Sequence, residues 1–340
     1  MVCAAAASGK TNVIIERLLW LLSEGVNPQG IVVITFTNAA AAEIMSRLIA
    51  AYGSSAQGVF VGTIHSYANS LLKGYGVDTS DILDNELFDR LFIRVKNNLG
   101  CIKPVAHLLL DEAQDSTPQE FEFLLDMVQP QNYLLIGDIR QSIYRFREAD
   151  PDYLIELMRT PGVTTYHLNT NYRNDAAILR YAKGIIKLAG IDYIDYSQTA
   201  SLEEGAVYNQ TYDPERLITI IDSNGEWGKW FILTRTNDQL DTMREYLHAA
   251  QIPFDTFKRS NLDNDELYKR LSQNTVKLLT IHSAKGLEND YVAVIGAQFY
   301  NVEEICVSYV AATRARHRLF WLRKKAHRQT RLEKIGNWER

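Results

Sequence analysis

The stretch His107–Asp115, HLLLDEAQD, contains three leucines followed directly by two adjacent acids, Asp111 and Glu112. A short apolar run that ends in charge is typical of a strand buried on both faces, with the acids at its carboxyl end. Ligands of open parallel sheets bind beyond that end of the strands, and Mg²⁺ takes one or two protein carboxylates together with water. We therefore expect these acids to accept a hard cation at a sheet edge; a solvated acidic turn is the alternative.

A second motif, Ser8-Gly9-Lys10-Thr11, lies about 100 residues upstream and matches the end of the P-loop pattern. In that pattern, backbone N–H groups and a helix N-terminus bind phosphates, the lysine reaches the terminal phosphates, and the hydroxyl binds Mg²⁺. Here Ala4 replaces the first glycine, and Ala5 and Ala7 stand where further glycines are common. Alanine costs about 1–2 kcal/mol wherever the backbone must be left-handed. With the downstream acids, SGKT predicts a nucleotide site rather than an ordinary helix start, in a loop less tolerant than usual.

The composition of the 340-residue chain is that of an ordinary globular protein, with 46% hydrophobic and 23% charged residues. Its length suggests about two domains. No apolar run approaches the roughly 18 residues of a membrane helix, and the first residues do not resemble a signal peptide. Cys3, Cys101 and Cys306 are few and unclustered, which predicts neither disulfides nor a zinc site and suggests a reducing, cytoplasmic setting. The net charge of −5 requires that any nucleic acid bind in a local groove.

Apolar runs alternate with helix-like segments along the first half of the chain. Strands are expected at Gly30–Thr37, Gly58–His65 and Tyr133–Gly137, and a helix at Pro118–Val128. Residues from about 67 to 105 lack strand-like runs and are predicted to form a small helical insertion. This alternation predicts an α/β domain with a parallel sheet.

A second cycle of strands and helices begins near residues 161–170 and lacks a P-loop of its own. Residues 190–228 are turn-rich and weakly patterned. The later strands and helices are expected at Lys229–Arg235, Asp238–Ala250, Val276–His282, Tyr291–Gly296, Ser308–Arg316 and Arg318–Leu322. The basic segment 324–334 is expected to be a solvated tail, with nucleic-acid contact as the alternative. We predict an α/β fold with two domains, residues 1–165 and 166–340.

Seven segments occur in the order of the superfamily 1 helicase motifs: TFTNAAAAEI, GTIHSYANSLL, LLLDEAQD, LLIGDIRQSIYRFREA, LNTNYRN, TIHSAKGLEND and YVAATRAR. By this ordered set the chain resembles the UvrD/Rep/PcrA family over nearly its whole length. The resemblance implies two RecA-like domains of the P-loop NTPase type, with ATP in the cleft between them and single-stranded DNA across their tops. It also implies 3′ to 5′ translocation and unwinding at duplex/single-strand junctions, in a bacterial or phage-infected cell and without a membrane. It names no protein partner.

The resemblance assigns roles that agree with the needs of phosphoanhydride hydrolysis, namely charge neutralisation, an oriented water and cations at the developing charge. Glu112 is expected to be the base or water-positioning residue, and Gln141 the γ-phosphate sensor. Arg173 and Arg314 resemble two arginine fingers; packing or surface roles are the alternative. The expected Mg²⁺ ligands are Thr11 and Asp111. The expected ATP-binding residues are Ala6, Ala7, Ser8, Gly9, Lys10, Thr11, Tyr172 as the adenine-stacking ring, and Glu288 as a ribose or coupling contact.

Single-stranded DNA is held by stacking on aromatic side chains beside phosphate contacts. The segment IYRFRE offers Tyr144 and Phe146 interleaved with Arg145 and Arg147. Phe146 stands where relatives often carry a base-stacking tryptophan, so a smaller platform is expected. Other positions that match strand-contacting residues of the family are Phe36, Thr63, His65 and His282. A core position for the phenylalanine and structural roles for the histidines are the alternatives.

Two further features depart from the family pattern. Relatives carry a glutamine-bearing segment upstream of the P-loop that reads adenine, whereas this sequence starts nine residues before Lys10; this implies relaxed adenine selectivity or a trimmed N-terminus. Only about 40 residues separate Ser66 from the central acids, and about 100 separate NYR from TIHSAKG. Relatives have far longer insertions at both places, so a reduced first insertion and no second one are expected.

Three other functions stay open at this point. One is a DNA-stimulated ATPase that remodels protein–DNA complexes without processive unwinding, which the lack of a second insertion favours. Another is a nucleotide-gated DNA-binding module with weak hydrolysis, because of the alanines in the P-loop. The third, a small-molecule P-loop kinase, leaves the second set of motifs unexplained. The resemblance alone favours DNA over RNA.

Overall fold

The computed structural model describes residues 1–258, 262 and 264–323; the basic segment 324–334 lies outside them. The chain divides into two compact units. The first unit comprises Met1–Ala4, Gly9–Ile139 and Tyr144–Leu168, and the second comprises Ala5–Ser8, Arg140–Ile143 and the chain from Asn169 onward. Each unit contains a six-stranded sheet in which all pairings are parallel. The predicted α/β class with parallel sheets is therefore confirmed.

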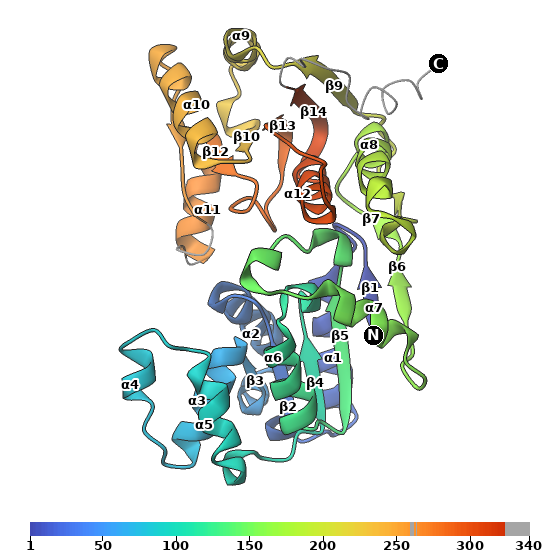
Figure 1. The fold of residues 1–340 in the computed structure, drawn as a ribbon, viewed down its shortest axis with the longest axis vertical. Helices are drawn as coiled ribbons and strands as arrows, with labels where there is room; N and C mark the ends of the chain where they lie inside the picture. Colours follow the sequence, from blue (N-terminus) through green and yellow to red (C-terminus); the bar gives the residue numbers. More distant parts are fainter. Residues whose placement is uncertain (259–261, 263, 324–340) are drawn as a thin grey trace. The chain divides into compact units, whose positions relative to one another are not determined.

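The first sheet has the order β3-β2-β4-β5-β1-β6 (Figure 1). Its strands are β3 Phe60–Gly62, β2 Ile31–Ile34, β4 His107–Leu110, β5 Asn132–Gly137, β1 Val2–Ala4 and β6 Tyr166–Leu168. Strand β4 lies between β2 and β5, and Leu109 pairs with Val33 on one side and Leu134 on the other. Leu109 packs into the core on one face of the sheet, while Leu108 and Leu110 pack into the core on the other. This burial on both faces explains the continuous leucine run that predicted the strand.

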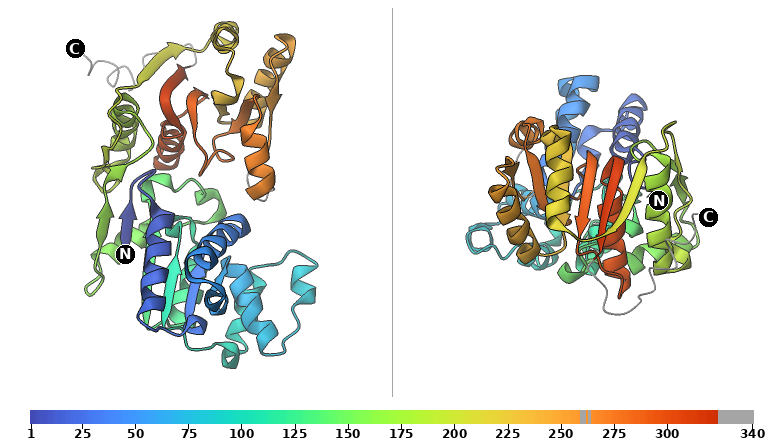
Figure 2. Two further views of the ribbon diagram at one scale, coloured as in Figure 1. Left: turned by 180° about the vertical axis from the view of Figure 1, so that it is seen from behind. Right: turned by 90° about the horizontal axis from the view of Figure 1, so that it is seen from above.

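Helices cover both faces of this sheet (Figures 1 and 2). On one face, α1 (Lys10–Ser23) and α2 (Asn38–Tyr52) pack on the strands through residues such as Leu18 and Ile44. The helices that contribute to the core on the other face are α3 Ile64–Gly74, α4 Ser80–Leu83, α5 Arg90–Lys96, α6 Pro118–Phe121 and α7 Pro151–Arg159. Helix α6 continues as a π-helix over Glu122–Met127. Between β3 and β4 the regular elements among the described residues are all helices.

The second sheet has the order β11-β12-β10-β13-β14-β9. Its strands are β11 Phe254–Asp255, β12 Val276–Thr280, β10 Trp230–Thr234, β13 Asn289–Ile295, β14 Ala315–Arg323 and β9 Ala206–Thr211. Helices α9 (Pro214–Asn224) and α10 (Asn237–Ala249) share one hydrophobic core with these strands. Helix α8 (Ala176–Ile186) packs against α12 (Val302–Ala312), as Figure 1 shows. The remaining elements are α11 Asn264–Ser272 and a two-stranded sheet of β7 Thr170–Asn171 and β8 Gln198–Thr199.

Several element boundaries predicted from sequence differ from those of the structure. The strand expected at Gly58–His65 ends at Gly62, because the side chain of Thr63 accepts a hydrogen bond from the backbone N–H of Ser66 and caps α3. The helix expected at Ser308–Arg316 starts at Val302, where Asn301 caps it through the backbone N–H of Glu304, and it ends at Ala312. The weakly patterned stretch 190–228 contains β9 and α9. Strand β6 pairs with β1 at the edge of the first sheet, and the division predicted after residue 165 stays a prediction.

No helix in the described part of the chain is both long and apolar enough to cross a membrane.

Candidate functional site

The carboxyl ends of the first sheet carry the predicted chemistry, because parallel strands all end at one edge. Phe36 follows β2, Asp111 and Glu112 follow β4, and Asp138 follows β5. The backbone N–H of Asp111 donates to Ile34 O at 2.9 Å, which extends the pairing of β4 with β2 to the first acid. The acids and the segment after β2 therefore lie at neighbouring positions along one edge.

The P-loop links β1 to α1 and adopts the left-handed backbone twice. Ala7 has φ 55° and Gly9 has φ 84°, so one of the alanines occupies a position that favours glycine. The N-cap Gly9 offers no side-chain cap, and the first turn of α1 contains no acid, which leaves its N–H groups suited to an anion. The hydroxyl of Ser8 is buried and has no hydrogen-bond partner among the described residues. These features fit a phosphate group.

The acids and the P-loop lysine form one charged cluster in the first unit. Lys10 Nζ lies 3.4 Å from Glu112 Oε1. Burial, together with the neighbouring carboxylate of Glu112, raises the pKa of Asp111 to about 7, against the opposing effect of Lys10. A divalent cation would favour the charged form of this buried carboxyl, so the residues fit Mg²⁺.

No group of three or more His, Cys, Asp or Glu side chains that could hold a metal occurs in the described part of the chain. Thr11 and Asp111 stay the predicted Mg²⁺ ligands, one hydroxyl and one carboxylate that would act together with phosphates and water.

Gln114 connects Glu112 to the end of β5. Its amide nitrogen donates to Glu112 Oε2 at 2.6 Å, and its carbonyl oxygen accepts from the backbone N–H of Asp138 at 2.9 Å. Gln114 is fully buried, and a Cβ on Gly137 would lie 2.7 Å from its Oε1, so a larger residue at Gly137 would displace this side chain. Glu112 itself has a left-handed backbone, with φ 50°. The hydrogen bond from Gln114 and the left-handed backbone together restrain the position of Glu112, the predicted base.

In the second unit, Arg314 and Gln141 lie together. Arg314 is nearly inaccessible and donates to Val310 O at 2.9 Å and to Leu287 O at 3.1 Å. Its Nη2 lies 3.5 Å from Gln141 Oε1. The backbone oxygen of Gln141 accepts from Lys285 Nζ at 2.9 Å. The predicted sensor and one predicted finger are therefore neighbours within this unit.

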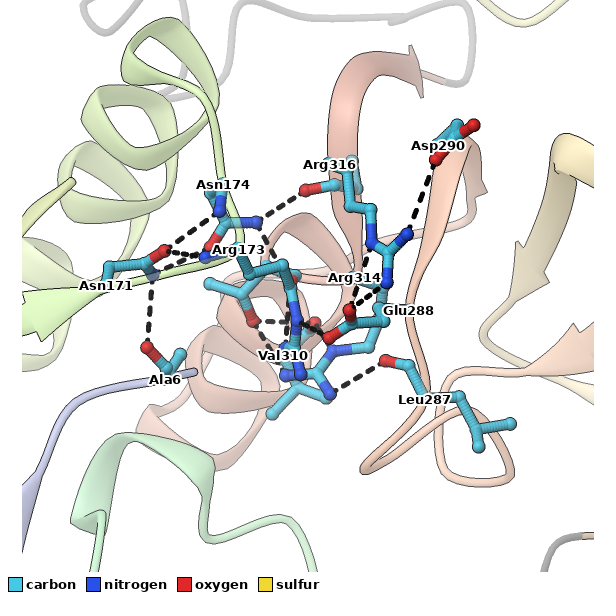
Figure 3. A network of polar contacts seen from close by, with 12 residues as sticks. Ala6, Asn171, Arg173, Asn174, Leu287, Glu288, Asp290, Val310, Arg314 and Arg316 are labelled. Atoms are coloured by element: carbon cyan, nitrogen blue, oxygen red, sulfur yellow. Dashed lines mark hydrogen bonds and ion pairs between the residues drawn. The ribbon is translucent and has the colours of Figure 1, made fainter. Parts of the chain in front are cut away.

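The other predicted finger, Arg173, is held by a carboxylate (Figure 3). Its Nε donates to Glu288 Oε2, and its Nη1 donates to Thr313 O at 3.2 Å. Arg316 donates from Nε to the second oxygen of Glu288 at 3.0 Å. Although burial opposes it, the two guanidinium groups hold the pKa of Glu288 below its usual value. Glu288, predicted as a ribose or coupling contact, therefore joins two arginines.

Two buried asparagines position the segment around Arg173. Asn171 Oδ1 accepts from the backbone N–H of Arg173 at 2.9 Å, and Asn171 Nδ2 donates to Ala6 O at 3.1 Å. Asn174 Nδ2 donates to Thr313 O at 3.1 Å. The backbone N–H of Tyr172 donates to Ala7 O at 3.1 Å, and its ring is 70% exposed, as an adenine-stacking role would need.

The predicted DNA residues of the first unit form an aromatic platform, which we define as Phe36, Tyr144, Phe146 and Arg147. The rings of Phe36 and Tyr144 stack with centroids 5.2 Å apart and an angle of 17°. Phe146 meets Tyr144 edge-on at 5.9 Å and is 67% exposed, while the guanidinium of Arg147 lies 5.7 Å from the Phe36 centroid. Exposed rings beside a cation are the features that bind single strands.

The other three predicted DNA residues have partners of their own. Thr63 caps α3. His65 lies on α3, where its ring stacks on Phe92 and its Nε2 is 3.4 Å from Asp89 Oδ1. In the second unit, His282 Nε2 lies 3.2 Å from Ile143 O, and burial lowers its pKa. Their contacts with DNA stay predictions.

Sequence reasoning missed Gln114, Lys285 and Arg316. All three lie inside the helicase-like motifs, at DEAQD, SAKGLE and TRAR. For Gln114 and Arg316 the available signal was a polar residue two positions after a predicted catalytic residue, and for Lys285 it was a cation three positions after His282 and three before Glu288. The partners of Arg316 could not be deduced, because Glu288 lies 28 residues away in the sequence.

Two family models match this chain. The UvrD/REP helicase N-terminal domain matches residues 1–99 and 99–161, and the UvrD-like helicase C-terminal domain matches residues 255–325.

Individual relatives are similar over most of the chain. DNA helicase II of Escherichia coli K12 is 24% identical over 375 residues, covering 81% of this chain and 52% of the relative. A probable DNA helicase of Mycoplasma pneumoniae is 25% identical, covering 94% and 79%. A putative ATP-dependent DNA helicase of Bacillus subtilis 168, YjcD, is 24% identical over 350 residues, covering 75% and 46%. The chain spans about half the length of the DNA helicase II proteins that it matches.

Proposed function

Because this chain belongs to the UvrD/Rep helicase family, we propose that it hydrolyses ATP to move 3′ to 5′ along single-stranded DNA and to separate strands at duplex junctions. The main support for the proposal is that the predicted DNA-binding and catalytic side chains follow the carboxyl ends of two paired strands. Phe36 of the aromatic platform follows β2, and Asp111 and Glu112 follow β4, which pairs with β2. A shift in the acids on phosphate binding can therefore reach the platform through one sheet edge.

The hydrolytic step follows from the charges in the first unit. Lys10 and the N-terminus of α1 bind the phosphates, and Glu112 orients the attacking water and accepts its proton. The 3.4 Å distance between Lys10 and Glu112 supports this assignment, since both groups must meet the terminal phosphate. Thr11 and Asp111 would hold Mg²⁺, which neutralises phosphate charge when bound. Arg173 and Arg314 of the second unit supply positive charge to the γ-phosphate, and Gln141 senses it.

Movement requires that nucleotide favour one of two states of the motor. We assign the DNA-binding site of the first unit to the aromatic platform and that of the second unit to the segment containing His282. If the affinities of these two sites for DNA rise and fall in alternation as ATP binds and is hydrolysed, each cycle advances the protein along the strand. This cycle, and a cytoplasmic location in a bacterial or phage-infected cell, form part of the proposal.

A DNA-stimulated ATPase that remodels protein–DNA complexes is the second candidate. It is favoured by the region between Arg173 and β12, whose described residues form core strands and helices of the second unit. Such a chain would translocate without processive unwinding.

Strand displacement separates the two candidates. Duplexes with a 3′ or a 5′ single-stranded tail are incubated with ATP, beside a translocation assay on an end-labelled single strand. Displacement of the 3′-tailed duplex alone supports a 3′ to 5′ helicase. Translocation without displacement supports the remodelling ATPase, and displacement of the 5′-tailed duplex alone contradicts the polarity. Arg173→Ala should abolish movement in both assays, and normal ATP hydrolysis by this variant contradicts the mechanism.

A further inference from the structure

We propose that Arg316 is a positioning residue for Arg173, acting through the carboxylate of Glu288 that both arginines bind. The inference rests on the proposed function, in which Arg173 reaches the γ-phosphate. Each oxygen of Glu288 has its own arginine: Oε2 accepts from Arg173, and Oε1 accepts from Arg316 through Nε at 3.0 Å and through Nη2. Figure 3 shows Glu288 between the two guanidinium groups.

The two predicted fingers are held by different chemistry. Arg314 donates to neutral main-chain oxygens of Val310 and Leu287. Arg173 donates to a carboxylate, and hydrogen bonds between charged groups are roughly twice as strong as neutral ones. Arg173 therefore gives up a charge-assisted hydrogen bond when it turns from Glu288 to a phosphate.

The presence of Arg316 lowers that loss. If Arg173 were the sole partner, its departure would leave the partly buried carboxylate of Glu288 without a counter-charge, which is unfavourable. Arg316 remains on Oε1, and its Nη1 also lies 3.7 Å from Asp290 Oδ1. The side chain of Arg316 is 44% exposed, against 11% for Arg173, so Arg316 is the outer partner and Arg173 the inner one.

The geometry around Arg173 suits an exchange of partners. Its backbone N–H is fixed by Asn171 Oδ1 at 2.9 Å, so the side chain can turn while the main chain stays in place. Among the described residues, Nη2 of Arg173 makes no hydrogen bond, and it is a donor that a phosphate oxygen can accept. Arg173 thus exchanges Glu288 for phosphate, while Arg316 keeps Glu288 neutralised.

A double-mutant cycle tests this role, with turnover measured at saturating ATP and single-stranded DNA. Arg316→Gln should lower kcat about tenfold and leave the KM for ATP within about twofold, because the exchange is penalised after ATP has bound. Glu288→Gln removes the charge that retains Arg173. In that background Arg316→Gln should change kcat by less than about twofold. Arg316→Lys, which keeps the charge, should restore most of the turnover.

Arg318→Gln is the matched control, because Arg318 is an exposed arginine of the same strand that lies over Tyr291, and it should leave kcat unchanged. A tenfold loss from Arg316→Gln in both backgrounds would show that Arg316 acts without Glu288 and would overturn the inference. An unchanged kcat in Arg316→Gln would overturn it as well.

A second readout separates this inference from the proposed function. The ratio of the Kd of ADP to that of ADP–aluminium fluoride reports finger engagement without turnover. If the wild-type chain binds nucleotide but does not hydrolyse it, the proposed function fails, and the inference then requires that Arg316→Gln lower this ratio only when Glu288 is present. A wild-type chain that binds no nucleotide overturns both.

Discussion

The side-chain amide of Gln114 donates to Glu112 Oε2 at 2.6 Å, and the same side chain accepts from the backbone N–H of Asp138 at 2.9 Å. One buried glutamine therefore ties the acid after β4 to the first residue after β5. The chain continues from Asp138 to Gln141 and to the aromatic platform at Tyr144, so this link joins the acid to the segment that carries the predicted DNA contacts.

Removal of this link should slow hydrolysis more than it weakens nucleotide binding. Gln114→Leu keeps the approximate volume but leaves the N–H of Asp138 without this acceptor, which should lower the free energy of unfolding by about 1–3 kcal/mol. We expect kcat to fall at least about tenfold, with the KM for ATP changed less than about threefold. Gln119→Leu, at an exposed position of α6, is the control and should keep normal turnover. A normal kcat in Gln114→Leu would remove Gln114 from the account.

Replacement of Ala7 and of Ala5 in the P-loop by glycine should change the free energy of unfolding in opposite directions. Ala7 has φ 55°, so Ala7→Gly relieves strain and should raise the free energy of unfolding by about 0.5–1 kcal/mol after the entropic cost of glycine. Ala5 is buried and lacks a positive φ, so Ala5→Gly should lower the free energy of unfolding by about 1 kcal/mol. Denaturant unfolding of both variants measures the two signs. Destabilisation by both changes would contradict the assignment of strain to Ala7.

The buried acid predicts a conflict between stability and activity. Burial and Glu112 raise the pKa of Asp111 to about 7 in the folded chain, above its value in the unfolded chain. Protonation of Asp111 therefore favours the folded state. This contribution to the free energy of unfolding is complete below about pH 4 and is lost as the pH rises to about 7. Without nucleotide or Mg²⁺, Asp111→Asn should be more stable than wild type by about 2–4 kcal/mol at pH 8. The gain should shrink steadily below pH 7, and ATP turnover should be lost.

Unfolding measured from pH 4 to pH 8 checks this sign. Addition of Mg²⁺ with a nucleotide should stabilise the wild type more than the variant. A variant that is equally or less stable than wild type at pH 8 would show that Asp111 is not strained by its burial.

The aromatic platform predicts separate effects of stacking and charge on DNA binding. Phe146→Ala should weaken binding of single-stranded DNA by about 1–3 kcal/mol with little loss of fold stability, because the ring is 67% exposed. Arg147→Gln should instead lower the slope of log K against log salt by about one. Tyr133→Ala is the control, since Tyr133 is an exposed aromatic near the opposite end of β5. Equal losses in Phe146→Ala and Tyr133→Ala would contradict a specific platform.

The sequence predicted structure best where a single requirement, such as burial on both faces of a sheet, determined the residue types of a whole element. The leucines of β4 are buried on both faces, and the acids after them end the strand, so the element and its site could be predicted together. Strand β9, Ala206–Thr211, was missed because it is an edge strand whose residues are partly exposed and polar, so its pattern is weak. Helix α9 did carry a signal, since Asp213 caps it and Pro214 occupies its first turn.

Long-range pairings were the part that the sequence could not specify. Arg173 and Glu288 are 115 residues apart, and their ion pair depends on how β7, β13 and β14 come together in the second unit. His65 shows the reverse case, because a local cap at Thr63 placed it on a helix rather than on the expected strand. Motif order predicted which residues belong to the site, whereas tertiary structure determined their partners.

The most direct test of the motor is steady-state ATP hydrolysis by the purified chain, measured with and without single-stranded DNA. Glu112→Gln keeps the size of the side chain but removes the carboxylate, and it serves as the matched variant. We predict turnover that single-stranded DNA stimulates at least about tenfold and that Glu112→Gln abolishes while still binding nucleotide. Turnover that single-stranded DNA does not change, or that persists in Glu112→Gln, would contradict a DNA-stimulated motor. Nucleotide binding without any turnover would instead indicate a nucleotide-gated DNA-binding module.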